Sequence, residues 1–291
     1  MSYMKSRQKI LLGLLSLSDK NLSKLEVTKL AFLLKKESKL QYDKDFYEFV
    51  PYKYGPFSFE LYQDIRYLTK NGYFLNDNLD FESELESDID NQVKSLPKES
   101  RSAIHNLLDK FNSYTSTDLI KYVYDNYSWY AINSELEMAP KLSNKIAEIA
   151  VYSAGYEGET IDHFFNKIIK NGIKNIIDIR NNPVSRKYGF SKSQLVNNCS
   201  GLGLSYYEFP ELGIISDKRK KLKTFADYKS LLDDYEKIII ESQNSSIKKV
   251  ENIIKNHPSV LICFEKDYNY CHRNRLAKII SNDTGLDIKH I

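Results

Sequence analysis

Strand-like and helix-like segments alternate along the second half of the chain, and this alternation constrains the fold more than any other feature. Apolar runs typical of buried strands lie at 149–156, 176–180, 204–210, 260–266 and 287–291. Helical stretches separate them at 160–170, 191–199, 224–240, 246–256 and 271–281. Such alternation is typical of a parallel sheet covered on both faces. We therefore expect an α/β, Rossmann-like domain with a mainly parallel sheet and helices on both faces over residues 141–291.

The first half of the chain has the spacing of a mainly helical domain. Apolar periodicity predicts helices at 9–17, 57–70, 98–112 and 117–124. Ser23 and Glu26 form a capping-box spacing that opens a further helix. A β-prone segment at 46–54 ends at Gly55-Pro56, and the acidic stretch 76–90 is either a solvated loop or a sparse helix start. The pattern changes near 139–143, so we expect a mainly α, winged-helix-like domain over residues 1–140.

Length and composition exclude several classes of protein. A chain of 291 residues corresponds to about two domains, and a net charge of +3 excludes a uniformly basic coat for gripping nucleic acid. Three cysteines cannot build a disulfide framework, and no apolar run approaches the ~20 residues of a membrane span. The N-terminus lacks a signal-cleavage site, so we expect a cytoplasmic protein that does not bind a membrane.

Polar residues follow four of the predicted strands at the point where each strand ends. In open α/β sheets, ligands bind beyond the carboxyl ends of the strands, so we expect a site there. The candidate ligand-binding or phosphate-binding residues in these loops are Gly155, Tyr156, Arg180, Asn181, Ser185, Arg186, Lys266, His272 and Arg273. The competing interpretation is that these are ordinary solvated loops.

Arginine is the less expected cation in this chain, which has 34 lysines and 8 arginines. Four of the arginines lie in two of the strand-end loops: Arg180, Arg186, Arg273 and Arg275. The planar guanidinium suits carboxylate or phosphate, which favours an anionic, nucleotide-like ligand. Ion pairing with neighbouring acids is the alternative.

Three glutamates and one cysteine are the candidates for catalysis: Glu157, Glu211, Glu265 and Cys271. Two carboxylates across a pocket can perform acid–base or glycosidic-bond chemistry, but each could instead orient an arginine. Cys271 would begin a helix beside cationic side chains, where a thiol pKa is lowered; a buried structural cysteine is the alternative. The spacing of Cys263, Cys271 and His272 matches no standard metal site, so we expect no metal and no cofactor.

A basic run follows the third strand-end loop and consists of Lys218, Arg219, Lys220, Lys221 and Lys223. Five basic residues so close together could contact a phosphate backbone. The same run could equally be the solvated start of a helix.

The second half resembles the DUF488 family over roughly residues 148–291. The resemblance is carried by YSAGYEGETIDHFFNKIIKNGIKNIIDIRNNPVSR, FPELG and CFEKDYNYCHRNRLA. The turn after Glu211 departs from the family, because it reads Leu-Gly-Ile-Ile where a second glycine is common. The resemblance implies a Rossmann-like domain with nucleic-acid- or nucleotide-linked chemistry, in a setting of defence against foreign DNA.

The first half resembles winged-helix-like domains of the YwgA-like and Panacea type. KLEVTKLAFLLKKE, YKYGPFSFELYQDIRYLTKNGYF and YAINSEL carry this likeness. A winged helix implies DNA binding through its third helix. That helix carries Glu60 and Asp64 against Arg66 and Lys70, however, so docking to a protein partner is an equal alternative.

Two functions are consistent with these features. The first is a hydrolase of the DNA-glycosylase type that binds DNA or a nucleotide, removes a base, and uses Tyr156, Tyr206 or Tyr207 as a stacking face. The second is a non-catalytic sensor. Its α/β domain binds an anionic nucleotide-like ligand, and its helical domain docks DNA or a protein.

Overall fold

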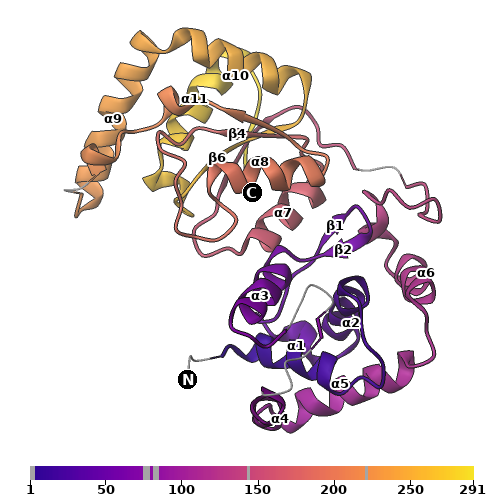
Figure 1. Cartoon of the computed structure of the whole chain (residues 1–291). Helices are drawn as coiled ribbons and strands as arrows, with labels where there is room; N and C mark the ends of the chain where they lie inside the picture. The colour runs from indigo at the N-terminus through magenta and orange to yellow at the C-terminus, as the bar shows by residue number, and fades with distance from the viewer. Residues whose placement is uncertain (1–3, 75–78, 81–84, 143–144, 220–221) are drawn as a thin grey trace. The chain divides into compact units, whose positions relative to one another are not determined.

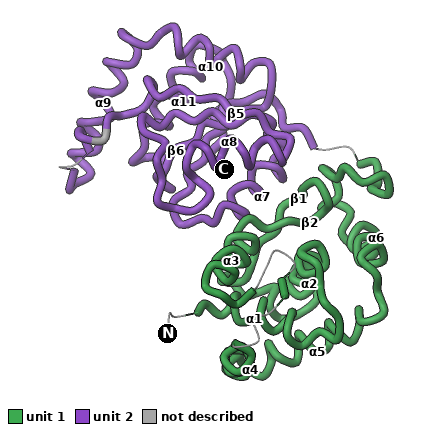
Figure 2. Tube along the Cα trace, in the orientation of Figure 1, with its two compact units in different colours: residues 1–142 green, residues 143–291 purple. Residues whose placement is uncertain are grey.

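The computed structural model describes residues 4–74, 79–80, 85–142, 145–219 and 222–291. The chain divides into two compact units, Met1–Leu142 and Ser143–Ile291 (Figures 1 and 2). Among the helices in these ranges, none has the length and apolar character needed to cross a bilayer.

The first unit is mainly helical, as predicted. Its helices are α1 (Ser6–Ser16), α2 (Lys24–Glu37), α3 (Phe59–Lys70), α4 (Glu86–Lys94), α5 (Lys98–Phe111) and α6 (Ser116–Asn126), with short 3₁₀ helices η1 (Lys39–Tyr42) and η3 (Ser128–Ala131). The capping box that was expected at the start of α2 is present, because Ser23 accepts from the amide of Glu26 and Glu26 accepts from that of Ser23. The acidic stretch belongs partly to α4; the positions from it that fall in 75–78 and 81–84 lie outside the described residues.

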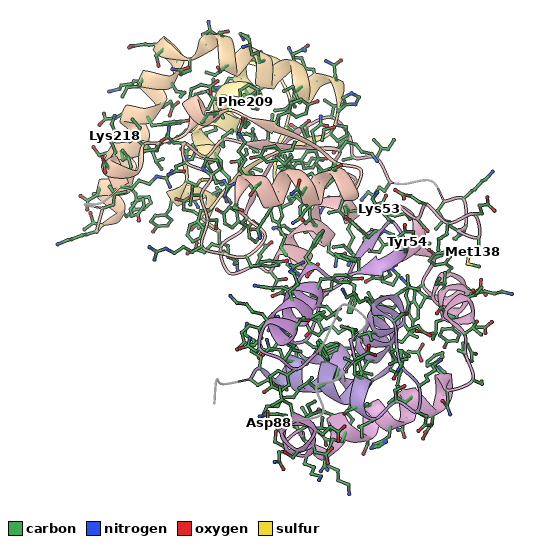
Figure 3. The ribbon with its side chains drawn as sticks, viewed as in Figure 1. Lys53, Tyr54, Asp88, Met138, Phe209 and Lys218 are labelled. Atoms are coloured by element: carbon green, nitrogen blue, oxygen red, sulfur yellow. The ribbon has the colours of Figure 1, made fainter. Side chains whose placement is uncertain are left out.

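A small hairpin replaces the single extended segment expected at 46–54. Strand β1 (Val50–Tyr52) pairs antiparallel with β2 (Gly55–Phe57), and Lys53 and Tyr54 form the tip (Figure 3). Gly55 therefore begins the second strand and does not end the first. Its φ of +91° is a conformation that glycine adopts without strain.

The second unit contains a five-stranded parallel sheet, as predicted. Its strands are β3 (Val151–Gly155), β4 (Asn175–Asp178), β5 (Ser205–Glu208), β6 (Ser259–Cys263) and β7 (Ile288–His290), in the order β5-β4-β6-β3-β7. The helices are α7 (Ile161–Lys170), α8 (Lys192–Gly201), α9 (Phe225–Ser242), α10 (Asn244–Asn256) and α11 (His272–Thr284), with 3₁₀ helices η4 (Pro210–Leu212), η5 (Ser216–Arg219) and η6 (Tyr268–Tyr270).

Helices cover both faces of this sheet. Val151, Ile177 and Leu261 point to one face, where they share a core with apolar residues of α9, α10 and α11. Helices α7 and α8 lie on the other side of the sheet (Figure 1). The near-continuous apolar strands of the sequence are therefore buried on both faces.

Strand β6 lies at the centre of the sheet, between β3 and β4. The register pairs Gly155 with Cys263 and Asp178 with Ile262, so three strands end side by side. Chain order reverses across these strands, because β4 and β5 lie on one side of β6 while β3 and β7 lie on the other. This is the edge at which open α/β sheets bind ligands.

Candidate functional site

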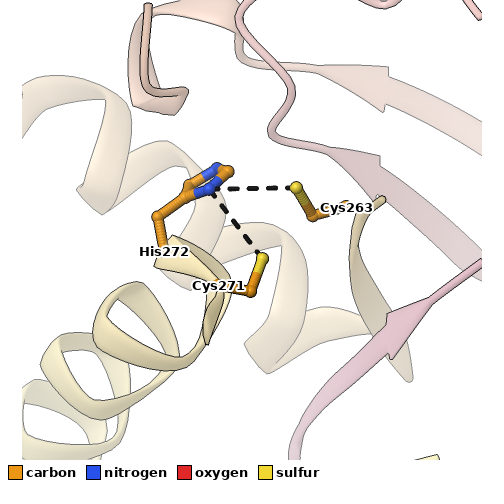
Figure 4. Close-up of side chains that lie close together, drawn as sticks. All are labelled: Cys263, Cys271 and His272. Carbon is orange, nitrogen blue, oxygen red and sulfur yellow. Dashed lines mark hydrogen bonds between the residues drawn. The ribbon is translucent and has the colours of Figure 1, made fainter. Parts of the chain in front are cut away.

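Two cysteines and a histidine meet at the carboxyl end of β6. Cys263 is the last residue of that strand, and Cys271 and His272 begin α11 after the chain has turned back through η6. The Nδ1 atom of His272 lies 3.8 Å from the Sγ of Cys263 and 3.9 Å from the Sγ of Cys271 (Figure 4). All three side chains are buried, so the group is held inside the unit.

The partners of His272 fix the tautomer of its ring. Nε2 lies 3.0 Å from the carbonyl oxygen of Ile179, which can only accept, so Nε2 carries the proton. Nδ1 lies 3.1 Å from a terminal nitrogen of Arg219, which can only donate. The lone pair of Nδ1 therefore faces Arg219 and the two thiols.

Glu265 and Arg219 complete this group, which we call the Cys263 cluster (Cys263, Glu265, Cys271, His272 and Arg219). Arg219, at the end of η5, donates to Glu265 Oε1 over 2.6 Å. The other carboxylate oxygen lies 3.1 Å from the Sγ of Cys263. Glu265 thus joins Arg219 to the strand-end thiol.

The pKa values within the cluster shift in opposite directions. A hydrogen bond from Cys271, helped by the charges of His272 and Arg219, lowers the pKa of Cys263 well below its ordinary value, although burial opposes this. Burial and the bonded Cys263 raise the pKa of Cys271, and burial raises the pKa of Glu265. Burial lowers the pKa of His272, but the negative Cys263 outweighs this and raises it overall.

A cavity of about 300 Å³ opens beside the cluster. Cys263 and Arg219 contribute to its wall, together with Asn181, Asn182, Ser185, Arg186 and Phe264. Arg186 is exposed, and the ring of Phe264 is 43% exposed and meets Tyr156 edge to face. The cavity therefore combines cationic, amide, hydroxyl and aromatic groups with a thiol.

Arg180 was predicted to bind a ligand, but its guanidinium is occupied within the fold. It is buried, forms an ion pair with Asp178, and donates to the hydroxyl of Tyr156 and the carbonyl of Phe190. Tyr206 donates to the same Asp178 over 2.7 Å. Arg180 lines the cavity, yet its charge is already neutralised.

The other two arginines after β6 are also engaged within the protein. Arg273 is 2% exposed and donates to the carbonyls of Glu265 and Lys266, so it holds the turn that carries Glu265. Arg275 pairs with Asp233 and Glu236 on α9. Ion pairing, the alternative considered for these arginines, thus accounts for Arg275.

The three candidate glutamates have different surroundings. Glu265 belongs to the Cys263 cluster, whereas Glu157 is exposed and accepts from the amide of Lys266 over 3.0 Å. Glu211 accepts from Ser246 on α10 and lines a second cavity of about 500 Å³. Glu265 thus contacts a thiol, Glu211 contacts a hydroxyl, and Glu157 contacts a backbone amide.

Tyr156 and Gly155 have structural roles at the end of β3. The Tyr156 ring is buried and stacks on Phe190 with centroids 4.2 Å apart, so this ring is not available as a stacking face for a base. A Cβ on Gly155 would lie 1.9 Å from the carbonyl oxygen of Glu265, so the glycine allows the strand end to pack against that turn. The exposed aromatic ring at the cavity is Phe264, which sequence reasoning missed.

The basic run is divided among different environments. Lys218 lines the second cavity, Arg219 joins the Cys263 cluster, and the amide of Lys223 donates to Asp227. Lys220 and Lys221 lie outside the described residues. The role of Arg219 in the cluster gave no sequence signal, because 46 residues separate it from Glu265.

Family models match both halves of the chain. Residues 160–280 match the model described as "Domain of unknown function DUF488", and residues 27–130 match "Antitoxin SocA-like, Panacea domain". Both resemblances drawn from the motifs are thereby confirmed, and every member of the Cys263 cluster lies within the first match. No curated protein and no solved structure matches the chain.

Proposed function

We propose that the second unit is a hydrolase that acts on a nucleobase-bearing, anionic substrate, either DNA or a nucleotide, and cleaves its glycosidic bond. The observation that carries this proposal is the cavity beside the Cys263 cluster. The exposed Arg186 offers a cation for a phosphate, and the exposed Phe264 offers a face on which a base can stack. Arg219 lines the same cavity while paired with Glu265. A volume of about 300 Å³ suits one nucleotide-sized group.

Glu265 is the side chain proposed to act as general acid or base. It lies at this cavity's edge, in contact with two of the residues that line it, Cys263 and Arg219. Glu211 serves as the matched control, because it is also a strand-end glutamate but lines the other cavity.

The match of the first unit to an antitoxin-type model supports a role in antitoxin systems or defence, with a nucleic acid or a protein as partner. One finding bears on DNA contact. In the sequence analysis the negative charge of Asp64 was an argument against DNA binding by α3. Asp64 is buried and paired with Arg7, so its charge does not repel a phosphate at the helix surface. Arg66 and Lys70 of α3 are exposed.

A specific observation also favours the sensor. Arg180 pairs with Asp178, and Glu265 pairs with Arg219. Arg273 donates to backbone carbonyls, so the protein itself already satisfies these charged groups. In a sensor, an anionic ligand would bind in the cavity and compete with Glu265 for Arg219.

The test uses labelled oligonucleotides with ordinary and modified bases at low salt, followed by gel shift and by treatment with hot alkali. We expect alkali-sensitive sites with the wild-type protein, a loss of at least about 100-fold in rate for Glu265→Gln, and little change for Glu211→Gln. Binding without strand breaks would favour the sensor. Equal loss in both variants would contradict the role given to Glu265.

A further inference from the structure

We propose that Cys263, Cys271 and His272 form a zinc-binding site with three protein ligands and a fourth position open beside the cavity. This inference goes beyond the proposed function and does not rest on it. It departs from the expectation drawn from sequence spacing, since Cys263 and the pair 271–272 become neighbours only through the turn at η6.

The distances fit a tetrahedral ion. One donor atom from each residue, two Sγ and one ring nitrogen, lie within 4.8 Å of one another. Zinc binds thiolate at about 2.3 Å and imidazole at about 2.0–2.1 Å, which places tetrahedral ligand atoms roughly 3.5–4 Å apart. The observed separations of 3.8 and 3.9 Å from Nδ1 to the two sulfurs fall within that interval.

The histidine is already oriented as a ligand. Metal-bound histidines usually donate their second ring N–H to a carbonyl or carboxylate, which fixes the tautomer. The Nε2 of His272 does so with the carbonyl of Ile179, so the lone pair of Nδ1 points at the thiols. His272 is 0% exposed, and this orientation is therefore set by the fold and not by solvent.

Glu265 lies beside the three donors without belonging to the mutually close set. A site with three protein ligands keeps one position for water, and zinc lowers the pKa of that water so that it can act as a nucleophile. Zinc-dependent nucleobase deaminases combine one His, two Cys and a glutamate that is not a ligand. Cys263 also lines the cavity, so we place the open position on that side of the site.

Arg219 competes with a metal ion for His272. Its guanidinium donates to the same Nδ1 lone pair that a metal would need, and its side chain is 31% exposed. One lone pair cannot serve both partners, so zinc must displace this contact. Arg219→Gln should therefore bind zinc more tightly than the wild type, because a positive charge next to the ion is removed.

The experiment titrates Zn²⁺ into the reduced, chelator-treated full chain and counts the bound metal by mass spectrometry. We expect one zinc per chain, at least about a 100-fold loss of affinity in Cys263→Ser and Cys271→Ser, and about a tenfold gain in Arg219→Gln. Cys199→Ser is the matched control, since Cys199 is a buried cysteine of the same unit on α8.

Cobalt substitution provides a measurement that needs no variant. Co²⁺ bound by two thiolates gives strong sulfur-to-metal charge-transfer absorption, so its appearance in the wild-type protein supports the site. Absence of that absorption would overturn the proposal, as would zinc binding that survives both cysteine substitutions. A Cys263–Cys271 disulfide in the protein together with no metal uptake after reduction would also overturn it and would assign the pair to thiol chemistry. None of these readouts requires substrate, so failure of the proposed function leaves the test intact.

Discussion

Each unit of this protein contains a buried polar cluster, and the two clusters differ in what surrounds them. In the first unit, Asp64 accepts from Arg7, Gln8 and Tyr47, and Arg7 also binds Glu60; we call this the Arg7 network. Its members join α1 to α3 through hydrogen bonds to one another. The Cys263 cluster instead holds soft, reactive donors and borders a cavity. A buried ion pair whose hydrogen bonds are made within the protein indicates a structural role. Side chains with sulfur and nitrogen ligand atoms gathered at one point beside a cavity indicate a binding or catalytic role.

The largest expected effect breaks the Arg7 network. Asp64→Asn removes one of the two carboxylates that pair with the buried Arg7 guanidinium and leaves only Glu60, so it should destabilise the first unit by about 3 kcal/mol. Trp129 is the single tryptophan and lies in the first unit, so its fluorescence during urea unfolding measures this unit. Glu265→Gln, in the other cluster, should cost less than about 1 kcal/mol, because its partner Arg219 is partly exposed. Equal costs would remove the distinction between the two clusters.

Lys29 gives the first unit a dependence on pH. It is 1% exposed and donates to the carbonyls of Tyr54 and Pro56, and burial lowers its pKa to about 7. Between pH 7 and about 10.5 the unfolded chain holds a proton that the folded unit has released, so stability should rise with pH by up to about 1.4 kcal/mol per unit. Below pH 7 both states are protonated and the burial cost is fully present.

The measurement is the urea midpoint of Trp129 fluorescence at several pH values from 6 to 10. Lys29→Met should flatten the curve, because no titrating amine is then buried. A wild-type midpoint that falls over this interval would contradict the assignment.

Gly155→Ala tests how rigidly the Cys263 cluster is held. The new Cβ would lie 1.9 Å from the carbonyl oxygen of Glu265, so the turn must move, at a cost of about 1–3 kcal/mol. All three cysteines are buried in the second unit, so their reaction with a thiol reagent in urea measures its unfolding. The control is Gly158→Ala, whose Cβ meets nothing within 4 Å and whose φ of +77° adds only local strain of about 1 kcal/mol. Equal destabilisation in both variants would show that strain, not the contact, is responsible.

The smallest effect is expected near Asp178 in the second unit. Like Asp64, it is a buried carboxylate that accepts from an arginine and a tyrosine. Tyr206→Phe removes one donor but leaves Arg180 in place, so we expect a loss of about 1 kcal/mol and no change in base removal. A variant that lost activity while remaining stable would place Asp178 in the functional site.

Local patterns predicted most of the elements. The capping box at Ser23 and the strand–helix alternation depend on neighbouring residues, and both are present. The central position of β6 was not predicted, because strand order depends on pairing between distant segments.

The site was predicted less completely, because a sequence identifies a charged side chain but does not show which way that side chain points. Arg180 and Arg273 were expected to face a ligand, but they bind the protein itself. Arg219 was considered only for nucleic-acid contact, and Cys263 was not selected as catalytic. Both enter the cluster through contacts across 46 and 9 sequence positions.

The strand order has a consequence for how the chain acquires its site during synthesis. β3 and β4 emerge first but do not pair with each other; each pairs with β6, which begins at Ser259. Before the chain has been synthesised past Ser259, β4 can pair with β5, but neither β3 nor β4 has its partner β6. A nascent or truncated chain that stops before β6 lacks both the strand that closes the sheet and the residues Cys263, Cys271 and His272. The Cys263 cluster consequently cannot form before the segment from β6 to the start of α11 has been synthesised.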